Sequence, residues 1–319
     1  MNMNETVEMI KDPRYFIFKS SGFYFIFCAL IALPVTIVLA VFHNMFSDKM
    51  HYVLGSTIPY GLMVLLLVAF LYGYKMWHIM GFKLPNMLAV FLMIPLMIFS
   101  YPMIMFVSVF SEFIAPMSSL NISDETLSLL ISLGPVVGWL LMAVIPGIVE
   151  ELICRGFIYG IFRNRGFVNA LFVSTICFAL LHLNLQQTLY ALVFGVLIGI
   201  VREMTKSVWP GVFAHILFNS VAVVNIYFGD KIYPPTGEVG TMTSVDATTI
   251  STFSEFWSIY SPLFLLAIGF GIVAFFILKL IQKVMHFKFD MTVNKEAPVI
   301  TGTYVIGWMI CIVLGILVS

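Results

Sequence analysis

Residues 149–162 read VEELICRGFIYGIF, a run that is apolar apart from two adjacent glutamates and one arginine. Glu150 and Glu151 are the only acidic residues between Thr126 and Val201. A charged side chain in the middle of a bilayer is costly, so such residues face the protein interior or water and are functional candidates. The fold and the function both depend on why three charges stand in this run.

The composition of the chain identifies the solvent in which it folds. Of 319 residues, 61% are hydrophobic and only 10% are charged, and the mean hydropathy is +1.03. Soluble globular domains carry about 25% charged residues. The chain is therefore predicted to be an all-α, polytopic transmembrane helix bundle in the lipid bilayer. Its formal net charge of zero gives no indication of nucleic-acid binding. Four cysteines in apolar stretches are predicted to be buried and unpaired: Cys28, Cys154, Cys177 and Cys311.

Nine segments are apolar and long enough to be candidate spans, since a span needs about 20 residues. They are 20–42, 55–77, 84–110, 133–162, 167–184, 188–203, 208–228, 260–281 and 302–318. A short interfacial helix is also expected within 113–132. The chain then divides into N-terminal anchoring spans (1–83), a catalytic membrane core (84–228), a polar extracytoplasmic loop (229–259) and C-terminal spans (260–319).

Basic residues predict the orientation. Only Lys49 and Lys231 fall on one side of the predicted bundle, and thirteen basic residues fall on the other. The thirteen are Lys11, Arg14, Lys19, Lys75, Lys83, Arg163, Arg165, Arg202, Lys206, Lys279, Lys283, Lys288 and Lys295. Cytoplasmic loops carry the excess of Lys and Arg. The N-terminus is therefore expected in the cytoplasm, with the protein in the cell membrane.

The three charges within 149–162 are expected to divide into a pair and a single carboxylate. Glu151 and Arg155 are four residues apart, so they share a helix face and can pair. Glu150 is rotated about 100° from Glu151 and has no obvious local partner. Such a carboxylate suits the work of a general base. A buried ion pair that only fixes helix packing is the alternative interpretation, and for Glu151 and Arg155 both roles can hold together.

Two further apolar segments carry histidine on helical spacing. CFALLHLNL (177–185) places Phe178 four residues before His182, and FAHILFNS (213–220) places His215 four residues before Asn219. The helical rise puts Glu150, His182, His215 and Asn219 at about 10–22 Å from the predicted cytoplasmic ends of their spans. All four side chains can therefore reach one zone inside the bilayer.

Another feature precedes the glutamates. Pro146 has no N–H, so it frees the carbonyl of Met142 and can kink the helix beside Glu150. A proline that the membrane helix simply tolerates is an equally good interpretation.

These motifs resemble a known family. Glu150-Glu151-x-x-x-Arg155, Phe178-x-x-x-His182 and His215-x-x-x-Asn219 are similar in order and spacing to the CPBP family, which includes type-2 CAAX prenyl proteases and the Abi group of bacteriocin-processing and self-immunity proteins. The resemblance covers roughly residues 130–228. It implies an intramembrane endopeptidase that acts on a membrane-associated or lipidated substrate. Glu150 with His182 would activate water, His215 and Asn219 would form an oxyanion hole, and Glu151 with Arg155 would support the site.

Zinc is an open alternative for the same residues. Glu150, His182 and His215 would make a site with two histidines, one carboxylate and an open position. The metal-free interpretation is favoured because the chain has no His-Glu-x-x-His cassette and Glu151 is expected to be engaged by Arg155. No cofactor is therefore assigned.

Two other classes of function compete with the protease. A non-catalytic scaffold or bacteriocin self-immunity protein could share the fold. A transporter with a proton-relay carboxylate is a third hypothesis. It is weaker because the sequence has no visible inverted repeat.

Overall fold

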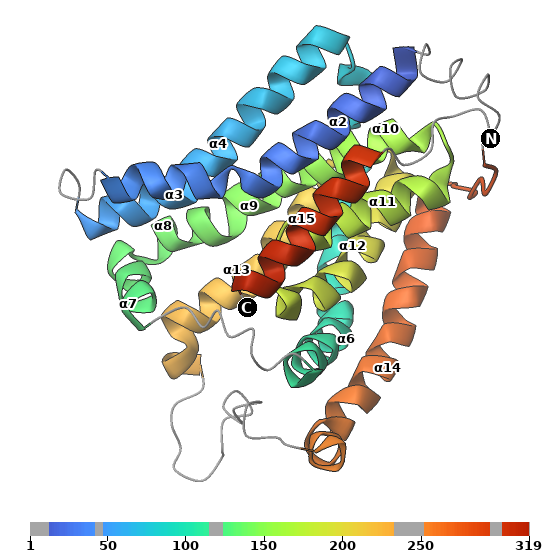
Figure 1. Ribbon diagram of the computed structural model, residues 1–319. Helices are drawn as coiled ribbons and strands as arrows, with labels where there is room; N and C mark the ends of the chain where they lie inside the picture. The colour runs from blue at the N-terminus through green and yellow to red at the C-terminus, as the bar shows by residue number, and fades with distance from the viewer. Residues whose placement is uncertain (1–12, 42–46, 115–123, 233–251, 294–301, 319) are drawn as a thin grey trace.

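The computed structural model describes residues 13–41, 47–114, 124–232, 252–293 and 302–318, and most of them are helical (Figure 1). The predicted all-helical bundle is confirmed. The main helices are α2 (Pro13–Leu30), α3 (Ala32–Val41), α4 (Asp48–Tyr74), α5 (Met87–Phe91), α6 (Met93–Ile114), α7 (Asp124–Leu133), α11 (Phe167–Leu180), α12 (Leu185–Thr205), α13 (Trp209–Ile232), α14 (Phe253–Val284) and α15 (Gly302–Val318). The helix containing the glutamates is described below.

Within the described ranges, seven helical segments are long and apolar enough to cross a membrane. They are Lys19–Val41, Asp48–Tyr74, Met87–Ile114, Pro135–Arg163, Gln187–Thr205, Trp209–Gly229 and Phe253–Val284. Of the nine predicted spans, 167–184 and 302–318 correspond instead to shorter apolar helices, α11 with 14 residues and α15 with 17. Most of the α11 side chains are buried within the protein, so this helix packs as a core element.

The predicted connecting segments are only partly described. The interfacial helix expected within 113–132 corresponds to α7, which begins at Asp124. The loop predicted over 229–259 lies mostly outside the described residues. Its two ends are not loop, because α13 continues to Ile232 and α14 begins at Phe253.

The helix that carries the glutamates is not a regular α-helix. It consists of α8 (Pro135–Trp139), a π-helical stretch η3 (Leu140–Val144), α9 (Ile145–Glu151), a second π-helical stretch η4 (Leu152–Ile158) and α10 (Tyr159–Arg163). Regular α-helical geometry was the prediction for this span, so the two π stretches are a correction. π-helical turns are rare and often occur at functional sites. The first one ends at Val144, two residues before Pro146, which cannot donate the usual main-chain hydrogen bond.

Glycines bring α13 close to this helix. A Cβ atom on Gly147 of α9 would lie 2.8 Å from Cγ1 of Ile216, and one on Gly211 of α13 would lie 3.0 Å from Oε2 of Glu151. Small residues at helix contacts in membranes allow the two backbones to approach closely. The glutamates and His215 are therefore held against each other by rigid neighbouring helices.

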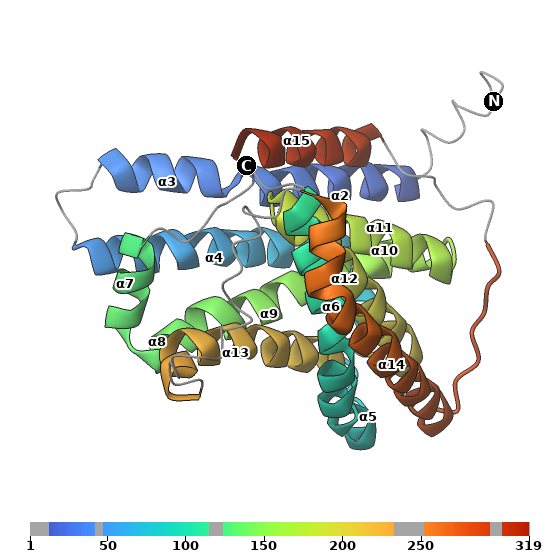
Figure 2. The ribbon, with the colours of Figure 1, turned by 90° about the horizontal axis from the view of Figure 1, so that it is seen from below.

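The first and last helices of the described chain pack against each other, away from the glutamates and His215. α2 and α15 lie side by side (Figures 1 and 2), and the Thr303 hydroxyl donates to the carbonyl of Lys19 over 3.2 Å. Similarly, the Tyr304 hydroxyl lies 3.0 Å from the Ser21 hydroxyl, to which it donates. α14 packs along α6, where Phe106 and Phe264 rings lie 5.0 Å apart. All four cysteines are buried and free, which confirms their predicted role as small apolar residues.

Candidate active site

Glu151 and Arg155 form the predicted ion pair. Arg155 Nη1 donates to Glu151 Oε1 over 2.8 Å, and both side chains are fully buried. The guanidinium carbon of Arg155 also lies 4.1 Å from the centre of the Phe178 ring, a cation–π contact. Through this contact with Phe178, the ion pair links the glutamate helix to α11.

Glu150 occupies a separate environment. The hydroxyl of Tyr60 on α4 donates to Glu150 Oε1 over 2.9 Å. The other oxygen, Oε2, is buried and accepts no hydrogen bond from the residues that the structure describes. His215 Nε2 lies 3.9 Å from this oxygen, beyond hydrogen-bond distance. One carboxylate oxygen of Glu150 is thus held in place by Tyr60 while the other makes no hydrogen bond, and Oε2 of Glu151 is buried without one as well in the described part of the chain.

His215 stands between the two glutamates. Its Nδ1 lies 3.1 Å from Glu151 Oε1, and its Nε2 faces Glu150. An ionised carboxylate only accepts hydrogen bonds, so Nδ1 of His215 carries the proton in this contact. The imidazole ring packs edge-on against Phe178, 5.6 Å away between ring centres, and against Phe194 at 5.1 Å. These contacts fix the ring orientation and place a proton on Nδ1.

His182 lies beyond the end of α11, in a turn where Leu183 adopts a left-handed conformation (φ 49°). Its Nδ1 is 3.0 Å from the carbonyl of Phe178, so Nδ1 donates and Nε2 is left as an acceptor. The His182 ring packs edge-on against Phe178 at 5.1 Å. In the described part of the chain no hydrogen bond or ion pair joins His182 to either glutamate. The two histidines are neighbours through Phe178, which both rings contact.

Asn219 is linked to the proline rather than to the glutamates. Its Nδ2 donates to the carbonyl of Met142 over 3.2 Å. This is the carbonyl that Pro146 leaves without its usual helical partner. One N–H of the Asn219 amide therefore supplies the hydrogen bond that the Met142 carbonyl lacks within its own helix. An amide nitrogen carries two donors, so a second N–H exists for another acceptor.

The alternative zinc set does not assemble in this arrangement. No group of three His, Cys, Asp or Glu side chains within the described ranges is placed to hold a metal ion. Glu150 and His215 approach each other, but His182 is turned toward the Phe178 carbonyl. The residues as placed do not fit a site with two histidines and one carboxylate.

Tyr60 was not predicted from the sequence. It belongs to the region 1–83, which was predicted to serve only as peripheral anchoring, and its contact with Glu150 corrects that interpretation. The available signal was a hydroxyl group inside an apolar helix, directly after Pro59. Such a signal is common in membrane helices, and nothing local connects it with a residue 90 positions later.

The fold and these contacts define a polytopic helical membrane protein with a buried glutamate–histidine site. Residues 132–221 match the family described as "Type II CAAX prenyl endopeptidase Rce1-like". This segment contains Glu150, Glu151, Arg155 and all residues of the two histidine motifs, and the resemblance predicted from the sequence is confirmed for it. Tyr60 lies outside the matched segment.

A second comparison agrees with the first. A protein of Bacillus subtilis (strain 168) named "Putative membrane peptidase YdiL" is 28% identical to this chain over 83 residues. The alignment covers 26% of this chain and 34% of the relative, so the chain spans about a third of the length of that relative. No solved structure matches the chain significantly.

Proposed function

We propose that the protein is an intramembrane endopeptidase in which Glu150 activates water to hydrolyse a peptide bond. The observation that carries this proposal is the different environment of the two adjacent glutamates. Glu151 is paired with the cation of Arg155 through Oε1, whereas Glu150 accepts from the neutral hydroxyl of Tyr60 and directs Oε2 toward His215 Nε2, 3.9 Å away. In the described part of the chain, Oε2 of each glutamate accepts no hydrogen bond, so the ion pair is what distinguishes them. The match of residues 132–221 to type II CAAX prenyl endopeptidases supports the same reaction class.

In the proposed reaction Glu150 takes the proton of a water molecule whose oxygen attacks the peptide carbonyl. The proton then passes to the leaving amine nitrogen as the carbon–nitrogen bond breaks, which restores the carboxylate. Tyr60 holds the carboxylate in one orientation throughout. His182, with Nε2 as an acceptor, is proposed to help position the water.

The negative charge that develops on the carbonyl oxygen needs donors. His215 is proposed as one donor: when both of its nitrogens are protonated, Nδ1–H donates to Glu151 and Nε2–H is left for the developing oxyanion. Asn219 is proposed as the second donor, through the amide hydrogen that does not serve the Met142 carbonyl. Donors aimed at such an oxygen in a water-restricted site often contribute the largest share of catalysis.

The substrate class follows from the location. A buried site in a helix bundle acts on a peptide that is itself at or in the membrane, so a membrane-associated or lipidated protein is proposed as the substrate. The non-catalytic scaffold or self-immunity alternative has no use for a buried glutamate that is held by a neutral tyrosine hydroxyl and faces a histidine 3.9 Å away. The orientation with the N-terminus in the cytoplasm of the cell remains a prediction from the loop charges.

Tyr60→Phe tests whether Glu150 is held as proposed. The hydroxyl is removed and the ring remains, so cleavage is expected to fall roughly tenfold or more, because a hydrogen bond to a charged group contributes about 1.5–3 kcal/mol. Tyr72→Phe is the matched control, since Tyr72 lies on the same helix and is 78% exposed. Unchanged cleavage in Tyr60→Phe would remove Tyr60 from the site.

Asn219→Ala separates the oxyanion role from the zinc alternative. Loss of one oxyanion donor is expected to lower kcat by roughly 10²–10³ with little change in KM. Elemental analysis of protein purified without a metal-affinity tag should give the same metal content for Asn219→Ala and the wild type. Ser220→Ala is the control, since Ser220 bonds Trp139 and the Ile216 carbonyl instead. One zinc per chain, lost together with activity in His182→Ala, would instead establish the metal mechanism.

A further inference from the structure

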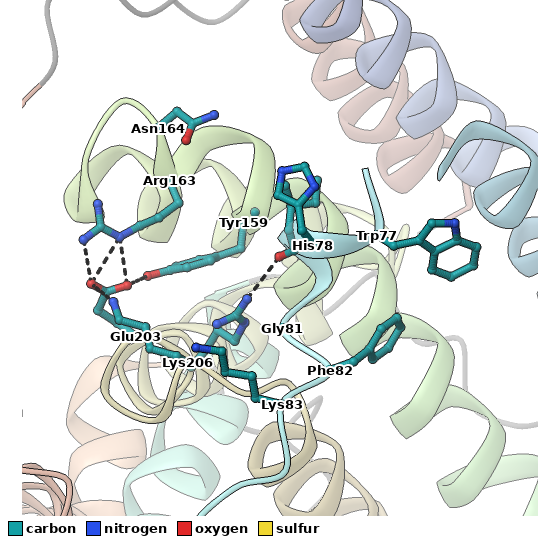
Figure 3. Close-up of a pocket in the computed structure, with 13 residues that line it drawn as sticks. Trp77, His78, Gly81, Phe82, Lys83, Tyr159, Arg163, Asn164, Glu203 and Lys206 are labelled. Carbon is teal, nitrogen blue, oxygen red and sulfur yellow. Dashed lines mark hydrogen bonds and ion pairs between the residues drawn. The ribbon is translucent and has the colours of Figure 1, made fainter. Parts of the chain in front are cut away.

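A basic cavity of about 740 Å³ lies apart from the glutamate site (Figure 3). Its walls come from the segment after α4 (77–83), from α10 and its C-terminal end (159–164), and from the end of α12 (202–206). None of the residues assigned to the proposed protease site lines it. It therefore calls for a separate explanation.

The cavity carries an excess of positive charge. Four basic side chains line it, from Lys83, Arg163, Arg202 and Lys206, against the one carboxylate of Glu203, which leaves three positive charges in excess. Glu203 is almost fully buried and already neutralised, because Arg163 and Lys206 pair with it and Tyr159 donates to it (Figure 3). An entering anion would therefore meet cations and not an unpaired carboxylate.

Arg202 supplies a fixed cation at the back of the cavity. It is 7% exposed, and it donates from Nε to the carbonyl of Arg155 over 3.0 Å and from Nη2 to the carbonyl of Ile79 over 3.2 Å. Two neutral carbonyls hold its guanidinium, which lies 5.4 Å from the centre of the Tyr159 ring and forms no salt bridge within the described residues. Gly81, with φ 72°, makes room for it, because a Cβ atom there would collide with the guanidinium of Arg202. The cavity is thus built around an arginine whose position is determined before any ligand arrives.

The cavity lies at the level where the spans end. The span-length helices end at Tyr74, Arg163 and Thr205, immediately beside the segments that line it. Three partly exposed aromatic rings adjoin it: Phe82 lies 6.4 Å from Trp77 and 5.9 Å from Trp209. Exposed aromatic residues of this kind mark the interface between membrane and water. The loop charges predict that this interface is the cytoplasmic one.

We propose that this cavity binds the phosphate of an anionic phospholipid headgroup. Basic pockets between membrane helices at the cytoplasmic interface suit such headgroups, and arginine provides donors in the geometry that a phosphate accepts. The aromatic rings of Trp77, Phe82 and Trp209 offer an apolar surface beside the cavity for the lipid's acyl chains. The site is independent of the proposed protease reaction.

Native mass spectrometry of the purified full chain with added phospholipid tests the proposal. The wild type is expected to retain phosphatidylglycerol at least tenfold better than phosphatidylcholine. Lys83→Gln combined with Lys206→Gln should lower phosphatidylglycerol retention roughly tenfold or more, since two cations that attract the anionic headgroup are removed. Lys19→Gln combined with Lys75→Gln removes the same charge from exposed positions outside the cavity and should leave retention unchanged.

Three outcomes would overturn the proposal. Equal retention of phosphatidylglycerol by the Lys83/Lys206 variant and the wild type would show that the cavity does not bind this lipid. An equal loss of retention in the Lys19/Lys75 control variant would show that the loss reflects the overall surface charge and not the cavity. Millimolar inorganic phosphate alone could stabilise the wild type and not the Lys83/Lys206 variant. That result would show that the cavity binds free phosphate and not a lipid headgroup. If the double variant does not fold, Lys83→Gln alone provides the same comparison, because Lys83 is exposed.

Discussion

Glu150→Gln is expected to abolish proteolysis while the protein remains folded in the membrane. Glutamine keeps the size of glutamate, and its amide oxygen can still accept the hydrogen bond from Tyr60. It cannot take a proton from water, so the rate should fall by roughly 10²–10⁴, the contribution of a general base. The measurement is cleavage of a precursor by purified protein, together with its melting temperature.

Glu112→Gln is the matched control for that substitution. Glu112 also lies on a membrane helix, α6, and takes no part in the glutamate–histidine site. The same chemical change there should leave cleavage intact. Cleavage at the wild-type rate by Glu150→Gln would reject Glu150 as the base.

The second large effect concerns stability. Glu151→Ala and Arg155→Ala each leave a charge buried without its partner, which costs about 3–5 kcal/mol of folding free energy. The structure predicts an order between them. After Arg155→Ala, Glu151 still accepts from His215 Nδ1, whereas after Glu151→Ala the buried Arg155 keeps no acidic partner. Glu151→Ala should therefore melt at the lower temperature in detergent.

The double variant completes this test. Removing both charges leaves no unpaired ion, so its melting temperature should recover part of the loss. Glu151→Ala should also lower cleavage more than Arg155→Ala does, because only the former leaves His215 Nδ1 without its acceptor. Two single variants that melt like the wild type would contradict the structural role of the pair.

The features that the sequence predicted correctly are local ones. Glu151 and Arg155 are four residues apart, and their pairing follows from helix geometry alone. The order and spacing of the three motifs predicted the family resemblance, which the match of residues 132–221 confirms. The apolar runs predicted the helices, since length and hydropathy determine which segments can span.

The features that escaped prediction depend on tertiary contacts. Tyr60 reaches Glu150 only because α4 packs beside the glutamate helix, and no periodicity links positions 90 residues apart. The contact of Asn219 with the Met142 carbonyl depends on how α13 crosses the π-helical stretch before Pro146. His215 could be placed near the glutamates from its depth, but which nitrogen meets which glutamate follows from side-chain packing.

The most direct test of the central claim is a quantitative comparison of protein termini in membranes from cells that carry wild-type protein, Glu150→Gln or Glu112→Gln. The account predicts at least one membrane-associated protein whose uncleaved precursor accumulates, and whose new terminus disappears, in Glu150→Gln alone. Identical termini and precursor levels in all three membranes would contradict the claim that Glu150 carries out proteolysis.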